Sequence, residues 1–339
     1  MLFPRNILYH IKKGSLPNLA LRDKLRAILL GVAMLVIPYQ VLPQACCSGG
    51  VPLGGSLGLG TADHKSLQFL ATYDYNLLND LMDVSEILPD DTRQRTTHSA
   101  ILEVNYGVSP RFSIAAVLPL IRQERNIRSF GGVMDFTSAQ GLGDAALLLK
   151  YRVFDPYKYP DLEWVVGAGP KFPTGRTNFT NNNGLAMAAD MQPGSGSLDG
   201  LFWSFFQQRN VWLPTLSLMA VTTIRISGEN RNYNQVQTYK FGNEFQFNLG
   251  VNYNTYLHWP VDIFTWFRYR NQSEDLIDGS TFPGSGGNWV YAIPGINLYF
   301  HPRMSWRISM DIPLYRKLEG TQLTTTYRFT TAISYSLPL

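Results

Sequence analysis

The chain has 339 residues and a formal net charge of +4, with 16% charged and 13% aromatic residues. Its basic residues are scattered among acidic ones and do not cluster with aromatic residues, which argues against a nucleic-acid-binding protein. Beyond residue 45, no apolar run is long enough for a membrane helix. A moderately polar chain rich in aromatic residues is typical of membrane β-barrels.

The amino terminus has the pattern of a signal peptide. Residues 1–26 are polar and basic, and residues 27–37 form an apolar run that ends at Pro38. This run is too short for a membrane helix but suits the core of a signal peptide. We therefore predict a signal peptide over residues 1–45, with cleavage near Ala45.

The two cysteines, Cys46 and Cys47, are adjacent. Neighbouring cysteines bridge each other poorly, and one pair does not supply a four-ligand zinc site. Three interpretations stay open: Cys46 is lipidated after cleavage, the two thiolates and nearby His64 bind a soft metal such as Cu(I), or both are ordinary periplasmic thiols. No cofactor is expected.

Residues 46–65 are rich in glycine and show no period. This pattern indicates an irregular segment ahead of the first strand. It is either a periplasmic lead-in or a plug that folds into the lumen.

Residues 66–339 are predicted to form an antiparallel, up-and-down transmembrane β-barrel. Residues 241–253 show the pattern most clearly, because Phe241, Phe247 and Val251 share one parity while Gln246 and Asn248 share the other. Strands of about ten residues are long enough to cross a bilayer at a tilt. The apolar face is therefore expected to meet lipid and the polar face to line a lumen.

We expect about twelve strands, with long extracellular loops and short periplasmic turns in alternation. The longest connection, residues 175–199, is expected either to fold inward as a constriction or to stand outside as a recognition surface. The expected strands cover residues 66–76, 98–108, 112–122, 144–154, 162–172, 200–208, 214–226, 241–253, 263–271, 289–300, 304–316 and 322–337.

The tryptophans are expected to form two outward aromatic girdles. Trp203 and Trp289 fall near the long loops, and the others near the short turns are Trp164, Trp212, Trp259 and Trp306. Four prolines within strands are expected to mark bulges, kinks or strand ends, because proline removes a ladder hydrogen bond. They are Pro119, Pro170, Pro294 and Pro313.

The inward parity contains charges of both signs, which predicts either a salt-bridged filling or a narrow polar conduit. We expect the arginines of the late strands to supply a positive field. The candidate lumen and selectivity residues are Arg268, Arg270, Arg307, Arg328, Lys150, Arg152, Glu244, Asp311 and Glu103.

Several short segments resemble the outer-membrane transporter-like barrels named after the meta-pathway of phenol degradation. They are residues 141–144 (Gly-Leu-Gly-Asp), 149–152, 171–175 (Lys-Phe-Pro-Thr-Gly), 118–120, 312–314 and 332–337. The resemblance covers residues 66–339 and departs at the final Leu339, where such barrels commonly end in an aromatic residue. It implies a bacterial outer-membrane barrel that passes small, often hydrophobic or aromatic, molecules, and it implies no catalytic residues.

The sequence therefore predicts passive transport of a small solute across the outer membrane, through the lumen or by lateral release. The alternatives are a structural or assembly role, a metal-binding role for Cys46 and Cys47, and an outer-membrane lipid hydrolase. His98 and Ser99 do not support the hydrolase, because neighbours on a strand point to opposite faces. Outer-membrane lipid and the solute are the expected partners, and nucleic acid is not.

Overall fold

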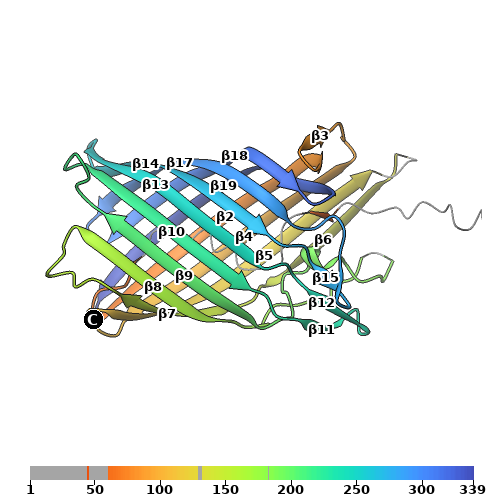
Figure 1. Ribbon diagram of the computed structural model, residues 1–339, viewed down its shortest axis with the longest axis horizontal. Helices are drawn as coiled ribbons and strands as arrows, with labels where there is room; N and C mark the ends of the chain where they lie inside the picture. Colours follow the sequence, from red (N-terminus) through yellow and green to blue (C-terminus); the bar gives the residue numbers. More distant parts are fainter. Residues whose placement is uncertain (1–43, 46–59, 129–131, 182) are drawn as a thin grey trace, which may run out of the picture. The chain divides into compact units, whose positions relative to one another are not determined.

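Twelve antiparallel strands close into a barrel in the computed structural model, which describes residues 44–45, 60–128, 132–181 and 183–339 (Figure 1). Each strand pairs with its sequence neighbour, and β19 closes the ring by pairing with β2, for example through Tyr335 opposite Phe69. The predicted barrel and its strand number are confirmed. The wall consists of β2 (Ser66–Asp83), β4 (Arg93–Gly107), β5 (Phe112–Arg128), β7 (Ala146–Arg152), β8 (Leu162–Lys171), β9 (Asp199–Gln208), β10 (Leu216–Ile226), β13 (Glu244–Tyr256), β14 (Pro260–Gln272), β17 (Gly287–His301), β18 (Met304–Leu318) and β19 (Thr321–Pro338).

Shorter strands extend or cap this wall. Strand β1 (Gln44–Ala45) pairs with β19, β3 (Glu86–Leu88) with β2, and β6 (Met134–Leu142) with β5. A separate four-stranded sheet is built from loop residues and comprises β11 (Asn230–Tyr233), β12 (Gln237–Lys240), β15 (Leu276–Ile277) and β16 (Ser280–Thr281). A short 3-10 helix, η2 (Ala189–Met191), lies in the longest loop.

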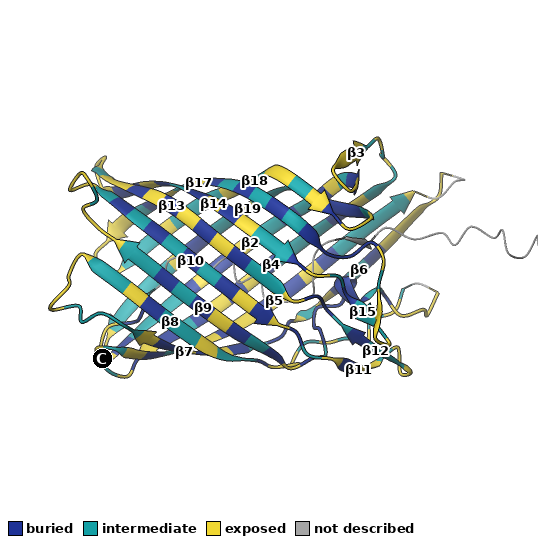
Figure 2. Cartoon of the chain, in the orientation of Figure 1, coloured by how far each residue is buried: buried dark blue, intermediate teal, exposed yellow. Residues whose placement is uncertain are grey.

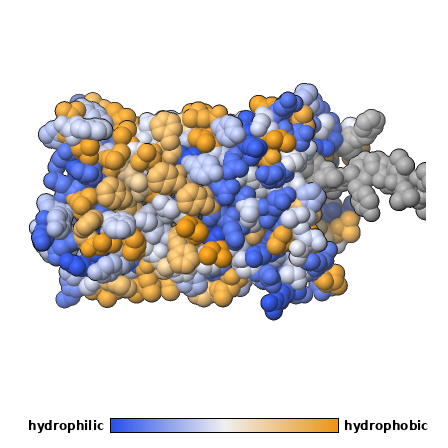
Figure 3. Space-filling model, viewed as in Figure 1, coloured by the Kyte–Doolittle hydropathy of each residue, from blue (hydrophilic) through white to orange (hydrophobic). Residues whose placement is uncertain are grey.

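The outer face of the barrel is apolar because side chains alternate across each strand. Along β13, Phe247, Leu249 and Val251 are exposed while Gln246 and Asn248 are buried, and the same alternation runs across the wall in Figure 2. Hydrophobic residues gather over the middle of the strands, between more hydrophilic ends (Figure 3). A closed antiparallel barrel with an apolar outer belt is the architecture of bacterial outer-membrane proteins, and this is where the chain resides.

One assignment in the alternating pattern was wrong. Phe241 was expected to face lipid, but it is 3% exposed and precedes β13, which begins at Glu244. Its ring packs with Tyr239 in the loop sheet at a centroid separation of 4.9 Å. The strand begins later than the apolar parity suggests because Phe241 packs in the loop sheet.

The two ends of the barrel differ, as expected for short periplasmic turns and long extracellular loops. Trp164, Trp212, Trp259 and Trp306 lie near the short turns and are exposed, as the girdle prediction requires. The prediction of a second outward girdle near the long loops was wrong. Trp203 is 5% exposed and Trp289 is 0% exposed, because both point into the lumen.

The barrel wall is interrupted at the predicted prolines. At Pro119 the partner of β5 changes from β7 to β6, and Gly143 donates its N–H to the Pro119 carbonyl at 2.9 Å. Pro170 is the next-to-last residue of β8. The β17–β18 ladder has a register shift beside Tyr291 and Pro313, and it skips the position of Pro294. Missing N–H donors thus coincide with local breaks in the ladder.

A further interruption separates β18 from β19 near the long-loop end. Their ladder ends at Asp311 opposite Arg328. Beyond it, β18 continues to pair with β17, and β19 continues to pair with β2. Gln44–Ala45 pair with β19 at Gln322 and Leu323 in this region.

The remaining amino-terminal predictions lie mostly outside the described residues. Of the predicted signal peptide, only Gln44–Ala45 are described, and of the Gly-rich segment only residues 60–65. Cys46 and Cys47 lie outside the described residues. Within the described ranges, no helix has the length and apolar character to cross a membrane.

Candidate functional site: the barrel lumen

The lumen has an aromatic wall that the sequence reading did not assign. Inward side chains of β8, β9, β10, β14 and β17 form one buried cluster, in which Trp203 and Phe205 stack at 6.1 Å with an interplanar angle of 8°. The cluster includes Val165, Trp203, Phe205, Met219, Val221, Phe264, Trp266, Trp289, Tyr291 and Ile293. The lumen of this barrel is therefore lined on one side by rings and not only by charges.

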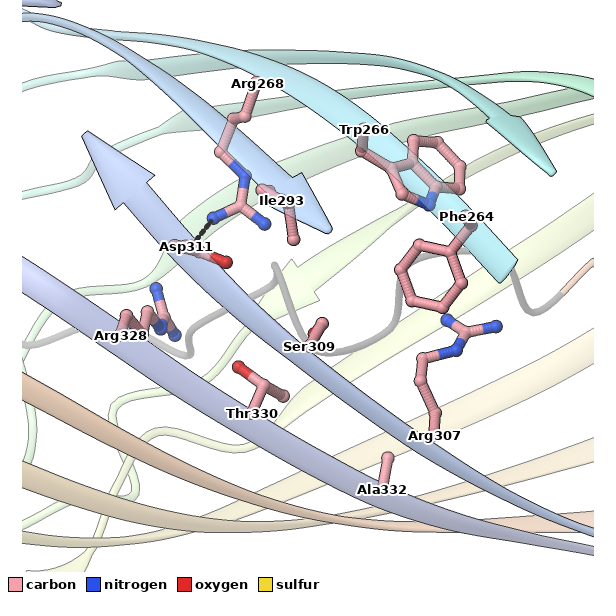
Figure 4. A pocket seen from close by; sticks show the side chains of 10 residues that line it. All are labelled: Phe264, Trp266, Arg268, Ile293, Arg307, Ser309, Asp311, Arg328, Thr330 and Ala332. Atoms are coloured by element: carbon pink, nitrogen blue, oxygen red, sulfur yellow. Dashed lines mark hydrogen bonds and ion pairs between the residues drawn. The ribbon is translucent and has the colours of Figure 1, made fainter. Parts of the chain in front are cut away.

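A belt of ion pairs and hydrogen bonds follows the inner face of the barrel wall. Arg268 donates from Nε to Asn248 Oδ1 at 2.8 Å. Its Nη1 donates to Asp311 Oδ2 at 2.5 Å (Figure 4). Arg328 lies opposite Asp311 in the ladder and donates to Asp74 Oδ2 at 2.6 Å. The belt thus runs from β13 through β14, β18 and β19 to β2.

Other lumenal cations are held between a carboxylate and a ring. Lys150 Nζ lies 3.2 Å from Glu103 Oε1 and 4.7 Å from the centroid of the Trp203 ring. Arg270 pairs with Glu244 at 2.9 Å and lies 4.6 Å from the Trp289 centroid. Removing a charge from water is costly, and both a counter-ion and a ring face offset that cost.

All nine predicted lumen residues are inward, and most are paired. Arg268, Arg270 and Arg328 each contact a carboxylate, so the expected positive field of the late strands is largely neutralised. Arg152 pairs with Glu163 at 3.1 Å. Arg307 lies on the Phe264 ring, 5.6 Å from its centroid. Their role in selectivity remains a prediction.

The belt borders a constriction. A cavity of only about 20 Å³ lies between Trp266, Ser309 and the Arg268–Asp311 pair, and Figure 4 shows its lining. That volume is close to what one water molecule occupies. The space between these side chains is therefore narrow.

On the short-turn side of the constriction the lumen widens into a cavity of about 470 Å³, which we call the vestibule. Phe264, Trp266 and Arg307 line both spaces, so the vestibule begins where the constriction ends. Its other polar walls include amide side chains from β9, β13 and β17 and the ion pair of Arg152 with Glu163. By the loop asymmetry this is the periplasmic end.

On the opposite side, residues 187–197 of the longest loop are buried or half-buried against the barrel, whereas most of the described residues of the loop before them are exposed. The loop contacts the barrel through Asp190, whose carboxylate accepts from Arg95 Nη1 at 2.6 Å, both groups being buried. Met187 and Met191 pack with Ala139 of β6. Of the two orientations left open by the sequence, the structure shows the inward one for the second half of the loop only.

A fully buried polar cluster, which we call the latch, fixes this loop to the wall. Lys171 Nζ at the end of β8 lies 2.5 Å from Asp144 Oδ2, 2.6 Å from Ser195 Oγ and 3.0 Å from Asp199 Oδ2. Ser197 Oγ donates to Asp199 Oδ1 at 2.7 Å. Asp144 also accepts from the backbone N–H groups of Gly175 and Ser195 at 3.0 and 2.9 Å. The latch therefore joins the break between β6 and β7 to both ends of the loop.

Glycines permit the close approach that the latch requires. A Cβ on Gly175 would lie 2.5 Å from Gly194 Cα and 2.9 Å from the Gly143 carbonyl carbon. Any side chain there would push the loop away from the wall. The Gly-Leu-Gly-Asp and Lys-Phe-Pro-Thr-Gly segments, which are separate in sequence, thus meet at one place in the fold.

The loop sheet covers the inward loop, and we call the two together the cap. Tyr239 and Phe241 pack against Ala189 of the loop, with Tyr233 and Ile277 at the edge. Tyr239 Oη donates to Asp275 Oδ2 at 2.5 Å, and Gly242 N–H donates to Asp275 Oδ1 at 2.7 Å. Burial raises the pKa of Asp275 above its ordinary value.

The sequence reading missed Asp144, Ser195, Ser197 and Asp199, and it missed the inward rings. A signal for Phe264 and Trp266 was present, because they share the parity of Arg268 and Arg270. No periodic signal marks the latch, since its members come from a strand break and the two ends of a loop.

His98, considered for a hydrolase, lies on the outer face. Its Nδ1 is 2.8 Å from Tyr73 Oη, while the adjacent Ser99 points inward and is 2% exposed. In the described ranges, no group of three or more His, Cys, Asp or Glu side chains could hold a metal ion. The metal-binding interpretation of Cys46 and Cys47 stays a prediction.

The fold is shared with known outer-membrane barrels. The COG4313 outer membrane channel from Pseudomonas putida F1 superposes with a TM-score of 0.63 at 12% identity, covering 83% of this chain and 97% of the channel. The β domain of the Bordetella autotransporter BrkA gives 0.46 at 11% identity, over 80% of this chain and all of that domain (100%). The P. putida toluene transporter TodX gives 0.39 at 8% identity, over 81% and 89% of the two chains.

The similarity to the COG4313 channel establishes the fold alone. No protein-family profile matches the sequence, and no curated protein matches it. The resemblance to the phenol meta-pathway barrels is therefore not confirmed, whereas the outer-membrane barrel fold is.

Proposed function

We propose that the protein is an outer-membrane transporter through which a small solute passes down its gradient. The observation that carries this proposal is the divided lumen. A vestibule of about 470 Å³ is separated from the cap by a constriction of side chains. A purely structural role does not require a cavity of this size next to a constriction.

The inward loop is the gate on the extracellular side. It is held to the wall by the buried Lys171–Asp144 and Arg95–Asp190 pairs, by backbone N–H groups of Gly175 and Ser195 that donate to Asp144, and by close glycine contacts. Displacing residues 172–198 would expose the aromatic wall and the ion-pair belt to the outside. The ion pairs then rearrange as the solute moves toward the vestibule.

The interrupted wall supports a second route, in which a hydrophobic solute leaves sideways into the membrane. The β18–β19 backbone ladder ends at Asp311 and Arg328. Nearer the loops, the Arg316 side chain still joins the two strands, because its Nη1 donates to the Thr325 carbonyl at 3.0 Å. A second break lies at residues 143–145, between β6 and β7. Both breaks lie in the half of the barrel nearer the cap, where a solute from outside would first arrive.

Planar-bilayer recording of the purified barrel tests the transport proposal. Replacing residues 176–192 by a short Gly-Ser linker is expected to raise the single-channel conductance, because the gate is removed. The control replaces Asn234 and Gln235, at the exposed tip between β11 and β12, with glycines and should leave conductance unchanged. Silence of both the intact and the shortened barrel, together with no uptake of hydrophobic solute by proteoliposomes, would overturn the proposal.

A further inference from the structure

The vestibule has the features of a binding site and not merely of a widening in the lumen. Asn252 is 6% exposed and Asn297 is 5% exposed, and both line the cavity. Their Oδ1 atoms are buried and have no hydrogen-bond partner among the residues that the structure describes. A buried carbonyl oxygen without a partner is unfavourable, so a molecule that donates to these atoms would relieve that cost.

The unmet groups include donors as well as acceptors. Arg152 Nε and Thr61 Oγ1 are also buried without a partner in the described part of the chain, and both residues line the vestibule. A ligand that satisfies this set must both donate and accept. Hydroxyl groups do both, whereas ammonium groups only donate and carboxylates only accept.

The charges of the vestibule balance. Arg152, Arg209 and Arg307 face three carboxylates, those of Asp63, Glu163 and Asp262. Glu163 lies 3.1 Å from Arg152 and 4.0 Å from Arg209. Asp262 accepts from Tyr299 Oη at 2.6 Å and also from Asn254. Because three cationic and three anionic side chains line it, the vestibule has no formal net charge and favours an uncharged ligand.

One wall of the vestibule is apolar. Phe205, Met219, Phe264 and Trp266 line it and belong to the aromatic cluster of the lumen. Aromatic rings present a flat apolar surface with a slightly negative face, which suits the C–H groups of a saturated ring. The cavity volume of about 470 Å³ falls within the range of small-molecule sites, roughly 300–1,000 Å³.

We propose that the vestibule binds an uncharged polyhydroxylated ring of about monosaccharide size, with the ring against Phe264 and Trp266 and its hydroxyls on Asn252 and Asn297. This rests on the proposed function, since it names the class of solute that the barrel takes. A site built to satisfy hydroxyls rejects an apolar analogue, because the buried amides are then left unpaired.

Calorimetric titration of the full-length, detergent-folded barrel with D-glucose and with myo-inositol tests the inference. Saturable binding of at least one polyol is expected, with no binding of cyclohexane-1-carboxylate or toluene. Asn252→Leu should weaken the binding at least tenfold. It should not lower thermal stability, because the replaced amide oxygen has no partner to lose among the described residues. If Asn252 had a purely structural role, its substitution would lower the thermal stability of the barrel and its polyol affinity together.

The matched control is Asn234→Leu, at the exposed tip of the loop sheet. It should bind the polyol as the unmodified barrel does. Absence of saturable binding by either polyol, or equal binding by Asn252→Leu and the unmodified barrel, overturns the inference. Binding is measured in detergent and conductance in a bilayer, so the two proposals are tested separately. A barrel that conducts but binds no polyol contradicts only the inference about the vestibule. A barrel that binds a polyol but lets no solute pass contradicts the transport proposal instead.

Discussion

Lys171 Nζ lies 2.5 Å from Asp144 Oδ2, and this contact joins the end of β8 to the break between β6 and β7. Both side chains are at most 1% exposed. The second carboxylate, from Asp199 at 3.0 Å, makes the ammonium group the common partner of two anions. Lys171 is therefore the residue on which the position of the inward loop depends most directly.

Replacement of Lys171 by methionine is expected to release the loop. It leaves two buried carboxylates without their cation, and breaking a buried pair typically costs about 3–5 kcal/mol. The variant should show a higher open probability in planar bilayers and a lower unfolding temperature. Lys158→Met, in an exposed periplasmic turn, is the matched control and should change neither. A closed channel with unchanged stability in Lys171→Met would show that the latch does not hold the loop.

The glycine contacts give a steric test of the same arrangement. A Cβ on Gly194 would lie 2.5 Å from the Gly175 carbonyl carbon, so Gly194→Ala must displace the loop or the wall. Overpacking of this kind costs about 1–3 kcal/mol. We expect a raised open probability and faster proteolysis within residues 172–198.

Gly200→Ala is the control for the glycine test, because the nearest neighbour of a Cβ at that position would be Phe202 Cε2 at 3.9 Å, an ordinary contact. Gly200 lies one residue inside β9, next to the latch residue Asp199. If both alanine variants behave like the unmodified barrel, the loop is not held by close backbone contact.

The barrel itself was predictable because its signal is local and repeated. Phe247, Leu249 and Val251 face out and Gln246 and Asn248 face in, as a two-residue period requires. Trp203 was assigned wrongly because β9 carries large apolar residues on both faces: Phe202 is outward, and Phe205 is inward with Trp203. Where both parities are apolar, alternation does not say which face meets lipid.

The candidate site was only partly predictable. Inward charges such as Arg268 and Asp311 follow from parity, but their pairing depends on barrel closure and on side chains that reach past β17. The latch brings residues 144, 171, 195 and 199 together only after the loop folds inward. The Gly-Leu-Gly-Asp and Lys-Phe-Pro-Thr-Gly segments are visible in the sequence as separate motifs, but only the folded loop brings them into contact.

The ion-pair belt predicts selectivity changes of opposite sign. In Asp311→Asn the Arg268 guanidinium keeps Asn248 but loses its counter-ion, so the constriction gains net positive charge. The reversal potential of the Asp311→Asn barrel in a salt gradient should therefore shift toward anion selectivity. Arg268→Gln should shift toward cation selectivity, since Asp311 is then uncompensated.

The control for the selectivity test is Asp155→Asn in the periplasmic turn, where the Asp155–Arg111 pair is partly exposed and 2.9 Å long. Solvent screens the charges of such a surface pair, so the pair interacts weakly. Its removal should leave the reversal potential unchanged. Shifts of the same sign in Asp311→Asn and Arg268→Gln would contradict a belt that acts through its charge.

The cap should tighten as the extracellular pH falls. Burial raises the pKa of Asp275, and nearby Asp190 adds to this, although hydrogen bonds from Tyr239 and Gly242 and the charge of Arg225 act against it. The folded cap therefore holds the Asp275 proton more firmly than the unfolded loop does. The stabilisation is fully present below the ordinary pKa of 3.8 and is lost as pH rises through the raised value.

Single-channel recording with pH varied only on the cap side measures this effect. The unmodified barrel should open more often as pH rises from about 4, the region of the ordinary carboxyl pKa. Asp275→Asn, which resembles the protonated form, should stay at the low-pH level across that range. Asp278→Asn is the control: Asp278 is exposed in the same loop, and its Oδ1 accepts from the Thr238 N–H at 2.8 Å. An asparagine there keeps an acceptor and should preserve the pH response. If Asp275→Asn responds to pH as the unmodified barrel does, the titrating group lies elsewhere in the cap.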